Sequence, residues 1–175
     1  MTARPWVGVS PCLIGVAVRY DGAEKRQSAV LELGPRVHWV PVCPESGASL
    51  GTPREPARLV GGAGAPHFVT WETARDQTER LRLFIDEALP RLPWSRLAGW
   101  VLKARSPSCG WGTTPRFSDK YVTEPEWKGN GLWAEALHRY EPDLPLIDEE
   151  GLLEHVTRSR WLERVGKRDR LLRSG

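Results

Sequence analysis

The chain has 175 residues, a length that allows one domain and leaves little room for a second. Since 40% of the residues are hydrophobic and 27% are charged, the chain can build a core, and global disorder is excluded. No apolar run approaches the ~18–20 residues that span a bilayer. The first six residues lack the long apolar segment of a secretory signal. We therefore expect a cytoplasmic protein that does not enter a membrane.

The formal net charge of +3 is distributed unevenly along the chain. Residues 158–175 contain seven basic and two acidic residues, which gives +5, and residues 1–157 therefore sum to −2. A basic tail can bind nucleic acid through its phosphates. Here Trp161, Leu162 and Val165 recur at helical spacing, which favours a terminal helix with a packed face. We expect one domain over residues 1–157, with residues 158–175 as a basic helix of the same domain and no nucleic-acid partner.

Short apolar runs bounded by breakers alternate with amphipathic stretches along the chain. The apolar runs predict strands, and the stretches with apolar residues at steps of three and four predict helices. In chain order the expected strands are residues 6–10, 37–42, 97–104 and 144–148, and the expected helices are residues 71–92, 130–140, 149–156 and 159–172. Residues 46–66 are rich in glycine and proline, and we expect a long ordered loop there. Strands that alternate with helices predict an α/β fold with a mostly parallel sheet.

The three cysteines, Cys12, Cys43 and Cys109, each follow the carboxyl end of a predicted strand. An odd number cannot pair fully into disulfides, and no CxxC motif indicates a zinc ribbon or a dithiol. In an open parallel sheet the carboxyl ends of the strands share one edge, where ligands bind. We therefore expect the three thiols to converge there. The alternative is that they are unrelated buried residues.

Three converging thiolates without a fourth are poorly suited to a closed structural zinc site. A histidine could complete one, but nothing in the sequence places a histidine beside the cysteines; the candidates are His38, His67, His138 and His155. On a 4Fe–4S cluster, three cysteines would leave one iron open to a substrate atom. Glu45 and Ser108 lie beside Cys43 and Cys109 in the sequence and are the candidates for acid–base chemistry.

Four ordered sequence blocks resemble the thiouracil desulfidase (TudS-like) family. The first is V-G-V-S-P-C-L-I-G at residues 7–15, followed by V-R-Y-D-G at 18–22. The others are residues 39–45 with 51–60, residues 102–110, and residues 129–134. Together they contain all three cysteines, and the resemblance extends over residues 6–150.

The resemblance implies a single Rossmann-like domain, an open and mostly parallel sheet with helices on both faces. It also implies an enzyme that removes sulfur from thiolated uracil compounds, with 4-thiouridine monophosphate as the expected substrate. By position in the motifs, Cys12, Cys43 and Cys109 would hold one 4Fe–4S cluster with one iron lacking a protein thiolate. Glu45 and Ser108 would be catalytic.

The mechanism expected from these residues is a hydrolysis. The open iron would polarise the thiocarbonyl group, Glu45 would deprotonate the attacking water, and Ser108 would relay a proton or hold the base. The phosphate of a nucleotide needs cationic donors at the same edge. The candidates in the matched blocks are Arg19, Arg54, Arg58 and Arg105. Each could instead form a structural ion pair.

A different class of function remains open. A non-catalytic iron–sulfur sensor, or an RNA-binding protein that uses the basic tail, would also carry cysteines and cationic residues. A sensor usually surrounds its cluster with four protein ligands, whereas this chain has only three thiols. RNA binding would show a steep dependence on salt. The oligomeric state is not predicted.

Overall fold

The computed structural model describes residues 4–62 and 64–175. Residues 1–3, at the start of the segment considered for a secretory signal, and Ala63, in the predicted loop, lie outside the described residues. Within the described part of the chain, no helix is long and apolar enough to cross a membrane.

The first sheet contains the four predicted strands, and all of them run parallel. They are β1 (Trp6–Val9), β2 (His38–Pro41), β5 (Leu97–Leu102) and β8 (Leu146–Asp148), in the order β2-β1-β5-β8. The register pairs β1 with β2 on one side and with β5 on the other, and β5 pairs with β8. The predicted parallel sheet is confirmed, with each strand shorter than the sequence pattern indicated.

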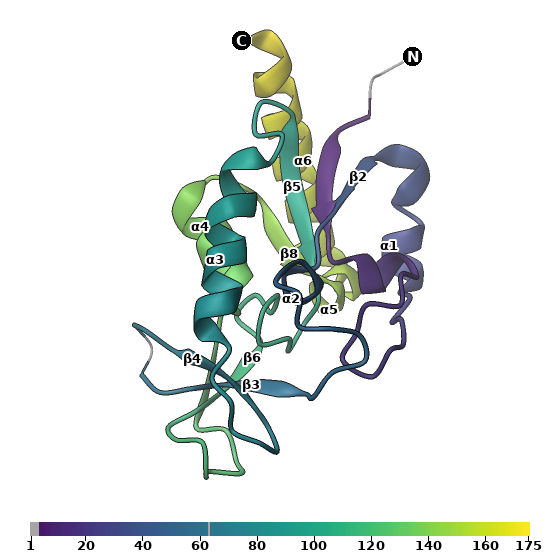
Figure 1. Ribbon diagram of the computed structural model, residues 1–175. Coiled ribbons are helices and arrows are strands. Elements are labelled where there is room, and N and C mark those ends of the chain that lie inside the picture. The colour runs from purple at the N-terminus through teal and green to yellow at the C-terminus, as the bar shows by residue number, and fades with distance from the viewer. Residues whose placement is uncertain (1–3, 63) are drawn as a thin grey trace.

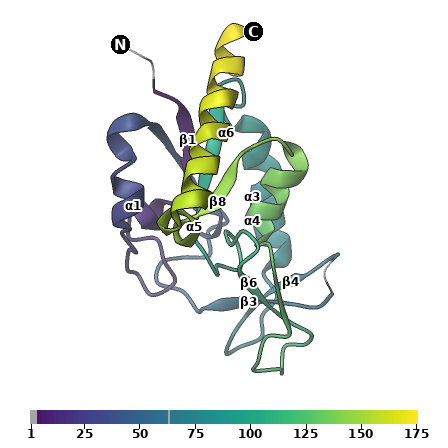
Figure 2. The same cartoon turned by 180° about the vertical axis from the view of Figure 1, so that it is seen from behind.

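Helices cover both faces of this sheet (Figures 1 and 2). On one face, Trp100 of β5 packs in a core with residues of α3 and α4, including Leu81 and Trp133. On the other face, Val101 of β5 packs with residues of α1, α5 and α6, including Trp161. The helices are α1 (Ser28–Leu31), α2 (Pro44–Gly47), α3 (Thr78–Ala88), α4 (Leu132–Tyr140), α5 (Glu149–Leu153) and α6 (His155–Ser174), with the 3-10 turns η1 (Pro11–Ile14), η2 (Gly34–Arg36) and η3 (Leu89–Arg91). The α/β class with helices on both faces is confirmed.

A second, mixed sheet lies beyond the carboxyl edge of the first (Figure 1). It has the order β4-β3-β6-β7, formed by β3 (Ala57–Val60), β4 (His67–Thr70), β6 (Thr114–Phe117) and β7 (Trp127–Gly129). Strands β3 and β6 are parallel, and the other two pairs are antiparallel. The loop predicted over residues 46–66 is therefore wrong, because these residues contain the end of α2 and all of β3. The glycines and prolines on either side of β3 are typical of a loop, and for this reason its short apolar pattern was not recognised as a strand.

The long helix predicted over residues 71–92 begins later than expected. Residues 71–77 form a turn in which the Thr70 N–H donates to the Arg75 carbonyl (2.9 Å) and Val69 pairs with Asp76. Helix α3 starts only at Thr78. Their backbone groups bond to the edge strand β4, so that these residues, despite their helical periodicity, fold back beside β4 as a turn.

The basic C-terminal segment is a helix that packs against the first sheet. In α6, Trp161 and Val165 are buried, and the Trp161 Nε1–H donates to the Pro145 carbonyl (2.9 Å). The Arg168 Nε–H donates to the Leu97 carbonyl (2.9 Å). Leu162, expected to pack as well, is 38% exposed. The boundary expected at residue 157 falls inside this helix.

Gly8 gives a direct test of how tightly the first sheet is packed. A Cβ built on Gly8 would lie 2.1 Å from the ring of Trp100, which is fully buried. We expect Gly8→Ala to lower the free energy of unfolding by about 1–3 kcal/mol, because the indole cannot move without disturbing the core. Gly166→Ala in α6, where the nearest atom is 3.5 Å away, should instead raise it by about 0.5–1 kcal/mol. Urea unfolding of both variants measures the difference, and equal stabilities would contradict this packing argument.

Candidate active site

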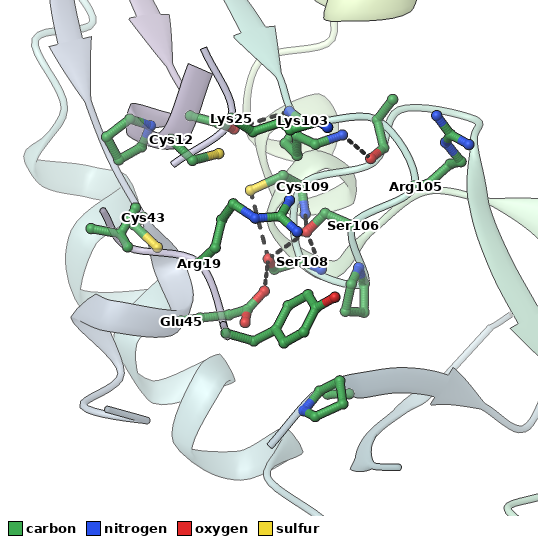
Figure 3. Close-up of a pocket in the computed structure, with 18 of the residues that line it drawn as sticks. Cys12, Arg19, Lys25, Cys43, Glu45, Lys103, Arg105, Ser106, Ser108 and Cys109 are labelled. Carbon is green, nitrogen blue, oxygen red and sulfur yellow. Dashed lines mark hydrogen bonds between the residues drawn. The ribbon is translucent and has the colours of Figure 1, made fainter. Parts of the chain in front are cut away.

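A pocket of about 370 Å³ lies at the carboxyl edge of the first sheet, and all three cysteines line it (Figure 3). Cys12 is in η1 directly after β1, Cys43 precedes α2 after β2, and Cys109 is in the loop after β5. Glu45 and Ser108 line the same pocket. The three thiols are unpaired. The convergence expected from the strand ends is therefore what the structure shows.

Backbone hydrogen bonds fix the two loops that carry Cys12 and Cys43. The Lys25 N–H donates to the Cys12 carbonyl (2.8 Å), and the turn of η1 ends at Gly15, whose positive φ of 99° favours glycine. The Gly47 N–H donates to the Cys43 carbonyl (2.9 Å), which begins α2. Both cysteines are thus held by the turn that ends their strand.

The loop that carries Cys109 is held by the beginning of α4. The Trp133 N–H donates to the Ser108 carbonyl (2.8 Å), and the Gly131 N–H donates to the Gly110 carbonyl (2.7 Å). These donors are among the first N–H groups of a helix, which have no partner within the helix itself. A Cβ on Gly131 would lie 2.4 Å from the Ser108 carbonyl group, so only glycine permits this approach. The fold therefore ties Cys109 and Ser108 to α4.

Glu45 joins the loops through both of its carboxylate oxygens. The Ser108 hydroxyl donates to Oε1 (2.6 Å), and Arg54 donates to Oε2 through Nε (2.8 Å) and Nη2 (2.7 Å). The side chains of Arg54 and Glu45 are only 9% and 12% exposed. Charge-assisted pairs of this geometry are strong. Arg54, expected to bind substrate phosphate, is thus already engaged with Glu45 and with the Val18 carbonyl.

The hydroxyl groups next to Cys109 form a directed chain. The Ser106 and Ser108 hydroxyls lie 3.0 Å apart, and Ser108 Oγ is 3.6 Å from the sulfur of Cys109. A carboxylate only accepts hydrogen bonds, so the Ser108 proton points to Glu45, and the Ser106 hydroxyl then donates to Ser108. Ser106 Oγ also accepts the Cys109 N–H (3.1 Å). No pattern in the sequence singled out Ser106.

Burial keeps two of the thiols protonated. It raises the pKa of Cys12 to about 11 and that of Cys109 to about 12, and the neighbouring Cys43 raises both further. The side-chain hydrogen bond with Ser10 acts in the opposite direction and lowers the pKa of Cys109. Cys43 thus lies close enough to Cys12 and to Cys109 to influence the pKa of both.

The candidate phosphate-binding arginines occupy different places. Arg19 and Arg105 line the pocket and pair with Asp21 (3.1 Å) and Glu150, respectively. Arg58 does not line it. Its guanidinium lies 4.1 Å from the centre of the ring of Trp71, which directly follows β4, and donates to the Val122 carbonyl (2.6 Å). Arg58 on β3 is buried by that sheet, and this corrects the expectation that it binds substrate.

Two lysines that the sequence analysis did not select also line the pocket. Lys103 follows β5 and pairs with the buried Glu149, and its Nζ also donates to the Ala104 carbonyl (2.9 Å). Lys25 lies on the facing loop and is exposed. A charged residue near the carboxyl end of the strand predicted over residues 97–104 was the available signal for Lys103, whereas nothing in the sequence indicated Lys25.

The burial of the thiols predicts an order of chemical modification in protein freed of metal. At pH 8, iodoacetamide should modify Cys43 first, because Cys12 and Cys109 are only 7% and 5% exposed and the thiolate is the reactive form. Since a raised pKa leaves few thiolates at pH 8, rates at Cys12 and Cys109 should keep rising toward pH 11. Peptide mass spectrometry follows each site. Unfolding in urea should abolish the order, and equal rates in the folded protein would contradict it.

Comparison with known proteins agrees with this arrangement. The sequence profile described as 2-thiouracil desulfurase matches residues 7–149. Protein YbbK of Bacillus subtilis (strain 168), which is uncharacterized, is 32% identical over 139 residues, or 74% of this chain and 87% of YbbK. The solved structure of the [4Fe-4S]-dependent thiouracil desulfidase TudS superposes with a TM-score of 0.68 at 31% identity, covering 86% of this chain and 95% of TudS. The matched residues contain all three cysteines, Glu45 and Ser108, and the chain belongs to the 2-thiouracil desulfurase family.

Proposed function

We propose that this protein is an iron–sulfur-dependent desulfidase that removes sulfur from thiolated uracil compounds by hydrolysis. The observation that carries the proposal is one pocket in which three thiols adjoin a hydrogen-bonded Glu45–Ser108 pair. Family membership and the likeness to TudS support the same assignment. Three unpaired cysteines also suit a reducing compartment such as the cytoplasm.

The donor set of the pocket fits one 4Fe–4S cluster on Cys12, Cys43 and Cys109. Soft thiolates select iron–sulfur clusters, zinc or copper(I). In residues 4–62 and 64–175, no three His, Cys, Asp or Glu side chains lie close enough to hold a single metal ion. Cysteines that each bind a different iron of a cluster stand farther apart than ligands around one ion. The chain has no fourth cysteine, so one iron would lack a protein thiolate.

When bound, the cluster supplies a soft Lewis acid that can accept a thiocarbonyl sulfur. The protein supplies the base: Glu45 takes a proton from a water molecule, and the water oxygen bonds to the ring carbon. As the carbon–sulfur bond breaks, the first proton reaches the sulfur through Ser108, and Glu45 takes the second proton from the new hydroxyl group, which becomes the carbonyl. Sulfur leaves as hydrosulfide, which takes up that second proton from solvent to give hydrogen sulfide. The products are the uracil compound and hydrogen sulfide, and no oxidation state changes. Ser108 suits the relay because it lies between Glu45 and Cys109.

Arg54 is the positioning residue of this pair. Its two hydrogen bonds to Oε2 fix the plane of the carboxylate and leave Oε1 facing Ser108. We infer this positioning role from the contacts of Arg54 with Glu45, and it requires no contact between Arg54 and the substrate.

The substrate proposed is 4-thiouridine monophosphate. A phosphate at the rim would meet Lys25, Arg19 and Arg105, which line the pocket from facing loops. The pair of Arg105 with Glu150 is largely exposed, with side chains 66% and 44% accessible, and exposed pairs contribute little stability. A phosphate can therefore compete for Arg105 without loss to the fold.

The proposal is tested by anaerobic assay of reconstituted protein with 4-thiouridine monophosphate. We expect one 4Fe–4S cluster by iron and sulfide analysis and equal amounts of hydrogen sulfide and uridine monophosphate as products. Each of the variants Cys12→Ala, Cys43→Ala and Cys109→Ala should lose both the cluster and the activity. A cluster that forms without any release of sulfide would refute the enzyme and favour a sensor.

The role of Glu45 is tested by Glu45→Gln in the cluster-loaded protein. We expect the absorption spectrum of the cluster to be unchanged and kcat to fall by at least ~10²-fold, the usual scale for the loss of a general base. Glu87→Gln, an exposed carboxylate of α3, is the matched control and should leave kcat unchanged. A Glu45→Gln variant with near-normal kcat would exclude Glu45 as the base.

A further inference from the structure

A second pocket of about 600 Å³ lies between α3, α4 and the second sheet, which Figure 2 shows side by side. It has no lining residue in common with the active-site pocket. Its walls are largely apolar, with Ile85 and Leu89 from the α3 end, Leu132 from α4 and Trp127 from β7. A pocket of this size that combines apolar walls with converging polar groups is typical of a small-molecule site.

Arg116 of β6 is the polar group that distinguishes this pocket. The residue is only 5% exposed, yet its Nε and Nη1 have no hydrogen-bond partner among the described residues. Its Nη2 donates to the Asn130 carbonyl. Burial lowers the pKa of the guanidinium, against the opposing influence of Glu135. A buried cation with unpaired donors is costly, so an anion is the partner that its chemistry requires.

Glu135, the acidic residue that influences Arg116, is hydrogen-bonded to other groups. The carboxylate of Glu135 accepts from Asn130 Nδ2 (2.8 Å) and from Arg139 Nε (2.9 Å). It therefore forms no hydrogen bond with Arg116. The basic residues Arg82 and Lys128 also line the pocket, where Asp86 is the second acidic residue. Four basic and two acidic side chains leave an excess of positive charge around an apolar interior.

Gly129 keeps room beside the guanidinium. A Cβ at this position would lie 3.0 Å from Arg116 Nε and 3.4 Å from Nη2. A side chain there would therefore crowd the same nitrogen that lacks a partner. Gly129 on β7 has no side chain, and Arg116 on β6 has an unpaired donor. These two independent features lie next to each other in the pocket.

We propose that this pocket is a second ligand site, which takes a small anion with an apolar or aromatic body. Arg116 binds the anionic group, a phosphate or a carboxylate, and the apolar walls hold the body. Arg82 and Lys128 at the rim add attraction for the anion. The site works without the cluster, because none of its residues lines the active-site pocket.

Calorimetric titration with phenyl phosphate and with benzoate tests the site and identifies the anionic group. We expect at least one of the two to bind, and Arg116→Met to weaken that binding at least ~10-fold, the scale of a lost charge-assisted hydrogen bond. Lys128→Gln, on an exposed side chain, should weaken it about 2–5-fold. Lys25→Gln, in the active-site pocket, should leave this binding unchanged. Absence of binding by both probes, or binding lost in Lys25→Gln but retained in Arg116→Met, would overturn the proposal.

Thermal unfolding without ligand separates a binding role from a structural one. If Arg116 is kept for a ligand, Arg116→Met should unfold at the same or a higher temperature than the unaltered protein, because a buried cation with unpaired donors is removed. A clearly lower unfolding temperature would mean that Arg116 serves the fold, and would overturn the assignment. Lys128→Gln, on an exposed side chain, should unfold at the temperature of the unaltered protein and is the control for stability.

Discussion

Parallel pairing of β1, β2 and β5 is the constraint from which the arrangement of the active-site pocket follows. Parallel strands end at the same edge of a sheet, so the three segments that leave them must turn within one region. Cys12, Cys43 and Cys109 lie in those three segments and therefore line one pocket, although 97 positions separate the first from the last. Any change that altered the register of this sheet would move the thiols relative to one another.

The contacts of Glu45 link the segments that line this pocket to one another. Its carboxylate connects α2 to the Cys109 loop through Ser108 and to the residues after Gly51 through Arg54. The loop with Ser108 is in turn bonded to the first N–H groups of α4. The carboxylate that we propose as the general base is thereby held on a rigid frame, as pre-organised catalysis requires.

Helix α4 is shared by the two pockets. Its first residues hold the carbonyl groups of the Cys109 loop, whereas Asn130, just before it, bonds to Arg116 of the second pocket and receives the Gly112 N–H (2.7 Å). Gly131 can approach the Ser108 carbonyl only because it has no side chain. The segment of residues 129–132 therefore serves both sites, with glycine at two of its four positions.

The sequence was sufficient to predict the first sheet and the gathering of the cysteines. Buried parallel strands are recognisable in a sequence as short apolar runs. Because each cysteine follows such a run, we could infer that the three cysteines lie at one edge of the sheet. Glu45 and Ser108 were found from their place next to cysteines and from the family resemblance. The second sheet was missed because its strands lie among glycines and prolines and carry polar or charged residues, such as Arg58 in β3, which are typical of a surface loop.

The tertiary structure alone decided the roles of the arginines. In sequence Arg54 and Arg58 stand four positions apart and look alike, yet one holds Glu45 and the other lies against Trp71. Likewise, Arg116 is one of many arginines in the chain until its burial and its unpaired donors are known. Local patterns report which residues are buried along an element, because periodicity is a local property. Which charged groups meet depends on contacts between elements far apart in the chain, and only the packed structure determines these.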